Sequence, residues 1–201
     1  MNKQVIIIGA SGHGKVILDI VQACGDKVLG FLDDFSRAEW CCGVPILGKP
    51  VDAVRYPEAC FVIGIGANQV RRRLGDELEL NWYTAIHPTA VISPSARIGE
   101  GTVVMPRAVV QAGATVGRHC IVNTAAVVEH ENHIADYVHI SPGAALGGNV
   151  RVGVECHIGI GACVRNNVSI CGGCTIGAGA AVVRDLNEPG VYAGVPARRL
   201  K

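Results

Sequence analysis

Two carboxylates flank an imidazole in the tripeptide Glu129-His130-Glu131. A carboxylate that hydrogen-bonds one ring nitrogen of a histidine fixes the tautomer and raises the basicity of the other nitrogen, as a general base requires. His130 follows the aliphatic residue Val128 by two places, so we expect it at a turn that points outward. The tripeptide is a candidate for general-base chemistry, and a histidine in a solvated, charged turn is the alternative.

Three glycines in the turn Gly9-Ala10-Ser11-Gly12-His13-Gly14 could bring backbone amides close to a phosphate at the start of a helix. Asp33 lies 19 residues after Gly14, where a carboxylate can reach a ribose hydroxyl. This chemistry indicates a nucleotide. The Gly-x-x-Gly-x-Gly spacing departs from the Gly-x-Gly-x-x-Gly fingerprint of dinucleotide-binding proteins. A structural tight turn, with Asp33-Asp34 as a solvated strand end, is the alternative.

Seven histidines and nine cysteines raise the question of a metal site. Cys171-Gly172-Gly173-Cys174 has the spacing of two metal ligands but lacks a second pair, so it is a weak zinc signal. The odd number of cysteines, and a start (residues 1–10) without the basic and apolar segments of a signal peptide, argue against a secreted protein. We expect a reduced, cytoplasmic protein without a metal.

A six-residue period runs through the second half of the chain. It fits neither an α-helix nor a simple strand alternation, and it matches the hexapeptide class of β-helix repeat. Small or β-branched residues precede the aliphatic position by two places in most hexads. The aliphatic positions are Ile86, Ile92, Ile98, Val104, Val110, Val116, Val122, Val128, Ile134, Ile140, Leu146, Val152, Ile158, Val164, Ile170, Ile176 and Val182.

If three hexads close one triangular coil, residues 18 apart in the sequence lie directly above one another in successive coils. We call such a set of stacked residues a column; its members are about 4.8 Å apart, the spacing of neighbouring β-strands. The aliphatic positions then make between five and six coils. Gly148 lies one coil away from His130 at the same corner, where it leaves room for a substrate and offers a backbone N–H to an oxyanion. Cys120, Cys156 and Cys174 share an inward column, so we expect them to fill the core.

The first part of the chain is built differently, because seven of the nine aromatic residues lie before residue 85. Apolar runs alternate there with helical segments, an order that gives a parallel sheet with its ligand site at the carboxyl ends of the strands. The expected strands are residues 5–8, 28–32 and 60–65, and the first helix is residues 15–24. We expect a Rossmann-like α/β domain over residues 1–83 and a β-helix domain with a C-terminal tail over residues 84–201.

The 201 residues carry 18 basic and 17 acidic side chains, so the net charge of +1 provides no general field for nucleic acid or an anionic membrane. The longest uncharged run, residues 166–183, contains two asparagines and four glycines and is not the continuous apolar stretch that a bilayer requires. We expect small-molecule partners, no nucleic acid and no membrane insertion.

Together these motifs resemble the NeuD/PglD-type sugar acyltransferases, and within them the UDP-amino-sugar N-acetyltransferases of bacillosamine synthesis. The resemblance covers essentially the whole chain. It implies a left-handed β-helix, acetyl-CoA as co-substrate, and homotrimers with active sites between neighbouring solenoids. The residues that carry it are the Gly9 to Gly14 turn, Phe31-Leu32-Asp33-Asp34-Phe35, Ile65-Gly66-Ala67-Asn68, the hexapeptide tract, Glu129-His130-Glu131 and Gly194-Val195-Pro196-Ala197-Arg198.

The resemblance also implies roles for single residues. His130 matches the catalytic base and Glu131 the acid that raises its basicity. Ala178 stands where the family has glycine, so its methyl group is expected to narrow the acetyl-CoA groove slightly. Ile160 and Ala178 are 18 apart, so they stack along one corner, as an extended pantetheine arm would require. The sugar-nucleotide positions are Ser11, Gly12, His13, Asp33, Asp34 and Gly66, and the acetyl-CoA positions are His139, Ile160 and Ala178.

We therefore expect an acetyl-CoA-dependent N-acetyltransferase that acts on a nucleotide-activated amino sugar, most closely a UDP-4-amino-4,6-dideoxy sugar, by direct transfer without a metal. A sugar O-acetyltransferase of the sialic-acid type is an alternative, because a histidine base serves a hydroxyl equally well. A metal-dependent hydratase of the γ-carbonic anhydrase kind would have no use for a nucleotide domain. A non-catalytic sugar-nucleotide-binding scaffold would leave the Glu129-His130-Glu131 turn unexplained.

Overall fold

The N-terminal part of the computed structural model, which describes residues 2–200, is an α/β domain with the strand order β3-β4-β2-β1-β5. All neighbouring strands of this sheet are parallel except β3 and β4. The elements are β1 (Gln4–Ile8), α1 (Gly12–Ala23), β2 (Lys27–Leu32), β3 (Trp40–Cys41), β4 (Val44–Gly48), the 3-10 helix η1 (Pro50–Arg55), β5 (Cys60–Ile63) and α2 (Asn68–Glu77).

Helix α1 packs its apolar face on this sheet. Ile17, Ile20 and Val21 are buried together with Val5 and Ile7 of β1. Their spacing of three and four residues puts the helical side chains on one side of α1, which is why the helix covers the sheet rather than extending into solvent. The predicted Rossmann-like arrangement is confirmed, and β4 adds a strand to it that the apolar runs did not indicate.

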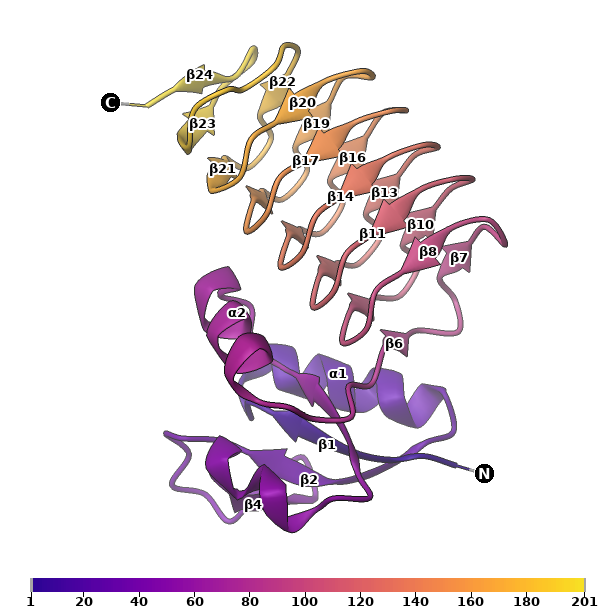
Figure 1. Cartoon of the computed structure of the whole chain (residues 1–201), viewed down its shortest axis with the longest axis vertical. Coiled ribbons are helices and arrows are strands. Elements are labelled where there is room, and N and C mark those ends of the chain that lie inside the picture. The colour runs from indigo at the N-terminus through magenta and orange to yellow at the C-terminus, as the bar shows by residue number, and fades with distance from the viewer. Residues whose placement is uncertain (1, 201) are drawn as a thin grey trace.

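The rest of the chain winds into a solenoid of three parallel sheets whose strand partners are 18 residues apart, as in the pair Val110 and Val128. Figure 1 shows these coils stacked along one axis, with the α/β domain at their N-terminal end and α2 beside the first coils. Within residues 2–200 each sheet has five or six solenoid strands, as the six-residue period predicts. A C-terminal hairpin of β23 (Gly190–Ala193) and β24 (Arg198–Arg199) follows.

The first solenoid sheet contains β6 (Ala85–Ile86), β9 (Val103–Val104), β12 (Ile121–Val122), β15 (His139–Ile140), β18 (His157–Ile158) and β21 (Cys174–Ile176). The second contains β7 (Val91–Ile92), β10 (Val109–Val110), β13 (Val127–Val128), β16 (Ala145–Leu146), β19 (Cys163–Val164) and β22 (Ala181–Val182). The third contains β8 (Arg97–Ile98), β11 (Thr115–Val116), β14 (His133–Ile134), β17 (Arg151–Val152) and β20 (Ser169–Ile170).

The solenoid interior is filled by the aliphatic positions and the small residues two places before them. Val128, Ile140 and Leu146 are fully buried. Cys120, Cys156 and Cys174 are also buried and occupy the inward places predicted for them. Because each coil buries one layer of these side chains on the next, the turns at the three edges of the solenoid are held in fixed columns.

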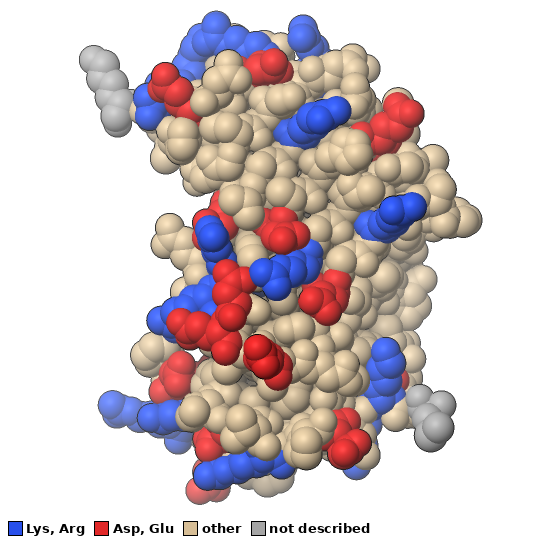
Figure 2. Space-filling model, in the orientation of Figure 1, with Lys and Arg blue, Asp and Glu red and all other residues tan. Residues whose placement is uncertain are grey.

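The two domains share a continuous apolar core. Val5 and Ile17 belong to the same buried cluster as Ala85, Val103 and Ile121 of the first solenoid coils. On the face shown in Figure 2, acidic and basic side chains intermingle where α2 meets the solenoid turns. Among residues 2–200, no helix has the length and apolar character needed to cross a membrane.

Candidate active site

The imidazole of His130 lies at the solenoid edge between β13 and β14. Its Nδ1 is 3.4 Å from Oε2 of Glu131, and the two side chains are 58% and 70% exposed. Glu131 has a φ of 60°, which turns the chain sharply so that its carboxylate folds back to the ring. The backbone N–H of His130 donates to Oε2 of Glu129 at 3.3 Å. Glu131 thus lies beside Nδ1 of the imidazole, Glu129 binds the His130 backbone, and Nε2 is left for other partners.

Gly148 lies directly against the His130 ring, one coil further along the same column. A Cβ at Gly148 would collide with Nε2 and Cε1 of His130. The adjacent Asn149 N–H donates to the carbonyl oxygen of His130 at 2.9 Å. Glycine was expected here to leave room for a substrate, but the imidazole itself occupies that room. Within residues 2–200 the Gly148 N–H has no hydrogen-bond acceptor.

The glycine turn before α1 closes tightly on itself. A Cβ at Gly14 would collide with the carbonyl oxygen of Gly9, which has a φ of 108°. These two glycines are therefore required by the turn itself. A Cβ at Gly12, by contrast, would meet no other atom within 4 Å, so the backbone there is open to a ligand. Ser11 is the residue before the helix and makes no side-chain capping hydrogen bond, which leaves the first N–H groups of α1 available.

The carboxylate of Asp33 organises the loop after β2. Its Oδ2 accepts the N–H of Ala10 at 2.7 Å, and its Oδ1 accepts the N–H groups of Phe35 and Ser36, both at 2.8 Å. Burial alone would raise the pKa of Asp33, but these three hydrogen bonds outweigh burial and lower it. Asp33 thus holds the glycine turn and its own loop together as an ionised carboxylate.

An open pocket of about 490 Å³ lies at the carboxyl ends of β1 and β2. Phe35 is 92% exposed beside it. Phe35 belongs to one of the sequence motifs but had no predicted role. The structure adds that its exposed phenyl ring lies beside a largely apolar pocket. Asp34 lines a neighbouring pocket with Phe35 and Arg73. The larger pocket is lined by Gly9, Ala10, Ser11, Asp33, Phe35, Ser36, Ile65 and Val70.

His139 lies at the junction of the two domains beside the backbone of Gly66, and the buried His13 is near enough for its charge to affect that of His139. Burial, together with the charge of Arg71, lowers the pKa of His13 to about 4. Burial, followed by the charges of His157, Arg71 and His13, lowers the pKa of His139 to about 3. Both imidazoles are therefore neutral near pH 7. Within residues 2–200, Nε2 of His13 and Nδ1 of His139 have no hydrogen-bond partner.

His139 also belongs to a stack on the solenoid wall. Its ring centroid is 4.6 Å from that of His157, and its Nε2 is 3.0 Å from the Asn123 side-chain nitrogen. Ile160 lies on the exposed edge between β18 and β19, and Ala178 lies on the same edge one coil further along. The two turns are joined by the Gly179 N–H, which donates to the Ile160 carbonyl oxygen at 2.8 Å. Ile160 follows His157 by three residues, so the three predicted acetyl-CoA residues lie on two adjoining columns of the solenoid, with His139 on a wall and Ile160 and Ala178 on the edge beside it.

The predicted residues consequently occupy four places in one copy of the chain. The His130 turn is on one solenoid edge, Ile160 and Ala178 are on another, and the nucleotide-like pocket is in the α/β domain. His13, Gly66 and His139 lie at the junction of the two domains. Among residues 2–200, no group of three or more histidine, cysteine, aspartate or glutamate side chains is arranged to hold a metal ion.

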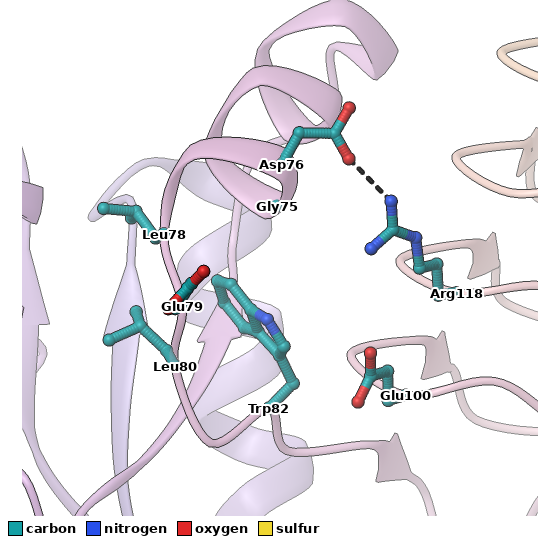
Figure 3. A pocket seen from close by; sticks show the side chains of 8 residues that line it. All are labelled: Gly75, Asp76, Leu78, Glu79, Leu80, Trp82, Glu100 and Arg118. Atoms are coloured by element: carbon teal, nitrogen blue, oxygen red, sulfur yellow. Dashed lines mark hydrogen bonds and ion pairs between the residues drawn. The ribbon is translucent and has the colours of Figure 1, made fainter.

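A second hollow, of about 370 Å³, separates the end of α2 from the solenoid. Figure 3 shows Asp76 of α2 and Arg118 of a solenoid turn pointing toward one another across it, with Nη2 to Oδ1 at 2.6 Å. The predicted site residues are not part of its lining, which consists of Gly75, Asp76, Leu78, Glu79, Leu80, Trp82, Glu100 and Arg118. This hollow is therefore a feature of the domain junction.

Comparison with known families matches residues 4–78 to the PglD N-terminal domain and residues 95–130 to the bacterial transferase hexapeptide (six repeats). The UDP-N-acetylbacillosamine N-acetyltransferase of Bacillus subtilis (strain 168) is 44% identical over 112 residues, which are 50% of this chain and 50% of that protein. The chain thus spans about half the length of this curated relative.

Solved structures match the chain over nearly its whole length. The acetyltransferase domain of PglB from Neisseria gonorrhoeae, in complex with acetyl coenzyme A, is 41% identical with a TM-score of 0.95 and 100% of both chains covered. PerB from Caulobacter crescentus, in complex with CoA and GDP-perosamine, is 36% identical with a TM-score of 0.93 and covers 98% of this chain and 97% of its own. The chain belongs to the PglD-type family of hexapeptide-repeat sugar acetyltransferases.

Proposed function

We propose that this protein is an acetyl-CoA-dependent N-acetyltransferase whose acceptor is the amino group of a nucleotide-activated sugar, with a UDP-4-amino-4,6-dideoxy sugar as the first candidate. The observation that carries the proposal is the His130 turn, an exposed imidazole whose Nδ1 lies 3.4 Å from Oε2 of Glu131. The complexes of its relatives with acetyl-CoA and with GDP-perosamine support the acyl donor and the class of acceptor.

In the proposed reaction, Nε2 of His130 takes a proton from the sugar amine as the amine nitrogen attacks the acetyl carbonyl carbon. Glu131, 3.4 Å from Nδ1, accepts the Nδ1–H and stabilises the imidazolium that forms. The Gly148 N–H, which has no acceptor within residues 2–200, is proposed to donate to the oxygen that becomes negatively charged. His130 then returns its proton to the departing thiolate.

The proposed acceptor site is the pocket at the carboxyl ends of β1 and β2. The uncapped start of α1 at Ser11 and Gly12 suits the diphosphate, because free N–H groups and the helix dipole both favour an anion. The exposed ring of Phe35 suits the face of a nucleobase. Asp33 holds the loop in place, and Asp34 is the carboxylate proposed to reach the ribose hydroxyls.

A complete site is proposed to need more than one copy of the chain. Ile160 and Ala178 lie on a different solenoid edge from His130, and Ile160 is 61% exposed. A second copy that places this edge beside the His130 turn would give the acetyl-CoA arm two walls. A homotrimer, with one such interface between each pair of neighbours, satisfies this requirement.

The test is a panel assay with purified protein, acetyl-CoA and UDP-, dTDP- and GDP-linked amino sugars, read by thiol release and by the mass of the product. Matched sugars that carry a hydroxyl in place of the amine are the control. We expect acetylation of an amino sugar and little of its hydroxyl counterpart. Transfer to hydroxyl sugars alone would identify an O-acetyltransferase, and tight sugar-nucleotide binding without any transfer would identify a scaffold.

A further inference from the structure

Arg71, on α2, is a fully buried cation without a carboxylate among its hydrogen-bond partners. Its side chain is 1% exposed. All of its partners within residues 2–200 are neutral oxygens, four from backbone carbonyls and one from a side-chain amide. Burial lowers the pKa of Arg71 to about 10, and the Glu155 charge is among those that oppose this effect. The group remains charged near pH 7.

The neighbouring Arg72, unlike Arg71, has an ordinary surface environment. Arg72 is exposed and pairs with Glu155 at 2.8 Å, an ordinary surface ion pair between the domains. Holding a guanidinium in the interior without such a pair costs considerable free energy unless its donors are all satisfied. The geometry around Arg71 satisfies them, so the position of each accepting carbonyl is fixed by the rigid fork of the guanidinium.

The carbonyls that Arg71 binds belong to two parts of the molecule. Nη1 donates to the carbonyl oxygens of Ile65 and Gly66, at 3.3 and 2.9 Å, in the loop between β5 and α2. Nε donates to His119 and Nη2 to Tyr137, both at 2.9 Å, at turns of two successive solenoid coils. One side chain therefore joins the loop to the solenoid.

Asn68 extends this connection by one more coil. Its Oδ1 accepts Nη2 of Arg71 at 2.9 Å, and its Nδ2 donates to the carbonyl oxygens of Glu155 and Cys156 at 2.9 and 3.0 Å. His119, Tyr137 and Glu155 are 18 residues apart in turn, so Arg71 and Asn68 together bind three stacked turns. The loop cannot move relative to the solenoid without breaking these bonds.

We propose that Arg71 is a positioning residue for the acceptor: it fixes the Ile65-Gly66 loop against the solenoid and so sets where the sugar lies relative to the acetyl-transfer chemistry. Ile65 lines the proposed nucleotide pocket, and Gly66 lies beside His139 of the solenoid wall. The inference rests on the proposed function. A lysine cannot replace Arg71, because one ammonium group lacks the planar fork that reaches both sets of carbonyls.

The test compares Arg71→Lys and Arg71→Met with the control Arg72→Met, which removes an interdomain ion pair at the surface. Steady-state kinetics with acetyl-CoA and a UDP-4-amino-4,6-dideoxy sugar, and a melting curve for each variant, are the measurements. For both Arg71 variants we expect KM for the sugar nucleotide to rise about tenfold or more, because binding must then order an Ile65-Gly66 loop that is no longer fixed in advance. KM for acetyl-CoA should change by less than about twofold, and Arg72→Met should resemble the wild type in both constants.

The proposal would be overturned if folded Arg71→Lys had the same KM for the sugar nucleotide as the wild type. It would also be overturned if KM for the sugar nucleotide and KM for acetyl-CoA rose equally. If Arg71→Met does not fold, Arg71→Lys alone decides, because it keeps the buried charge and removes only the fork. A wild-type protein that acetylates no acceptor refutes the proposed function instead. In that case, calorimetric titration of the wild type and of Arg71→Lys with UDP replaces the kinetics. An Arg71→Lys protein with the UDP affinity of the wild type would overturn the positioning role, whatever the activity of the protein.

Discussion

At the level of single residues, the contact between His130 and Gly148 is the most sensitive feature of the proposed site. The imidazole rests where a side chain at Gly148 would be. Its orientation therefore depends on the absence of a methyl group one coil away, as much as on the Glu131 carboxylate.

Gly148→Ala is expected to lower kcat by about 10- to 100-fold, because the new Cβ collides with Nε2 and turns the ring away from the reacting amine. The melting temperature should fall little, since the ring is exposed and can rotate into solvent. Kinetics and a melting curve of the variant check this. A variant with wild-type kcat would show that this position of the ring does not matter for the reaction.

His119 supplies a pH-dependent contribution to stability. Burial, with the charges of Arg118 and Arg71, lowers its pKa from 6.5 to about 4. The folded-state pKa is thus below the unfolded value, so the unfolded state binds the additional proton as the pH falls. The contribution of His119 is fully present above pH 6.5 and is lost progressively down to about pH 4.

Between pH 7 and pH 5 the free energy of unfolding should therefore fall by about 1 to 2 kcal/mol on account of His119. His119→Phe keeps a ring beside Trp82 and Tyr137 and should remove this part of the pH dependence. Urea unfolding at both pH values and equal protein concentration is the measurement, with His133→Phe on the solenoid surface as control. The same pH dependence in His119→Phe and wild type would rule out the buried, neutral state of His119.

At the level of elements, the alternation of inward and outward residues accounts for the stability of the solenoid. Val110 is fully buried, while Val109 in the same strand β10 faces outward and is only partly covered. Both are valines in the same two-residue strand, so they form a matched pair.

Val110→Ala should lower the free energy of unfolding by about 1.5 to 3 kcal/mol, because two methyl groups leave a closed interior that cannot collapse around the cavity. Val109→Ala should cost less than about 1 kcal/mol. Chemical denaturation of both variants separates these outcomes. Equal losses would contradict the inward assignment on which all of the column positions depend.

The sequence repeat predicted which residues stack but not what covers each sheet. His130 with Gly148, and Ile160 with Ala178, were placed correctly in columns because the 18-residue offset follows from the repeat itself. The burial of His139 beside Gly66 was not foreseeable, since it depends on which solenoid face the α/β domain packs against. Arg71 gave no signal either, because three consecutive arginines are typical of a solvated basic helix, while only this arginine turns inward.

At the level of the whole molecule, the division of the proposed site between two solenoid edges has a consequence for assembly. Activity should require association, because in the proposed site one copy of the chain supplies only one wall for acetyl-CoA. Light scattering is expected to give a trimer. Specific activity should fall on dilution below the dissociation constant of that trimer, and a monomer that keeps full activity at high dilution would contradict both the assembly and the shared site.

The central claim is that His130 acts as the general base of acetyl transfer, and replacing it tests this most directly. His130→Ala should lower kcat by about 10²- to 10⁴-fold, the usual contribution of a positioned general base. Glu131→Gln should lower kcat by a smaller factor, because it leaves the imidazole in place. Both variants should melt like the wild type, since both side chains are exposed. Steady-state kinetics with acetyl-CoA and the best amino-sugar acceptor gives the decision: a folded His130→Ala protein with the kcat of the wild type would contradict the account.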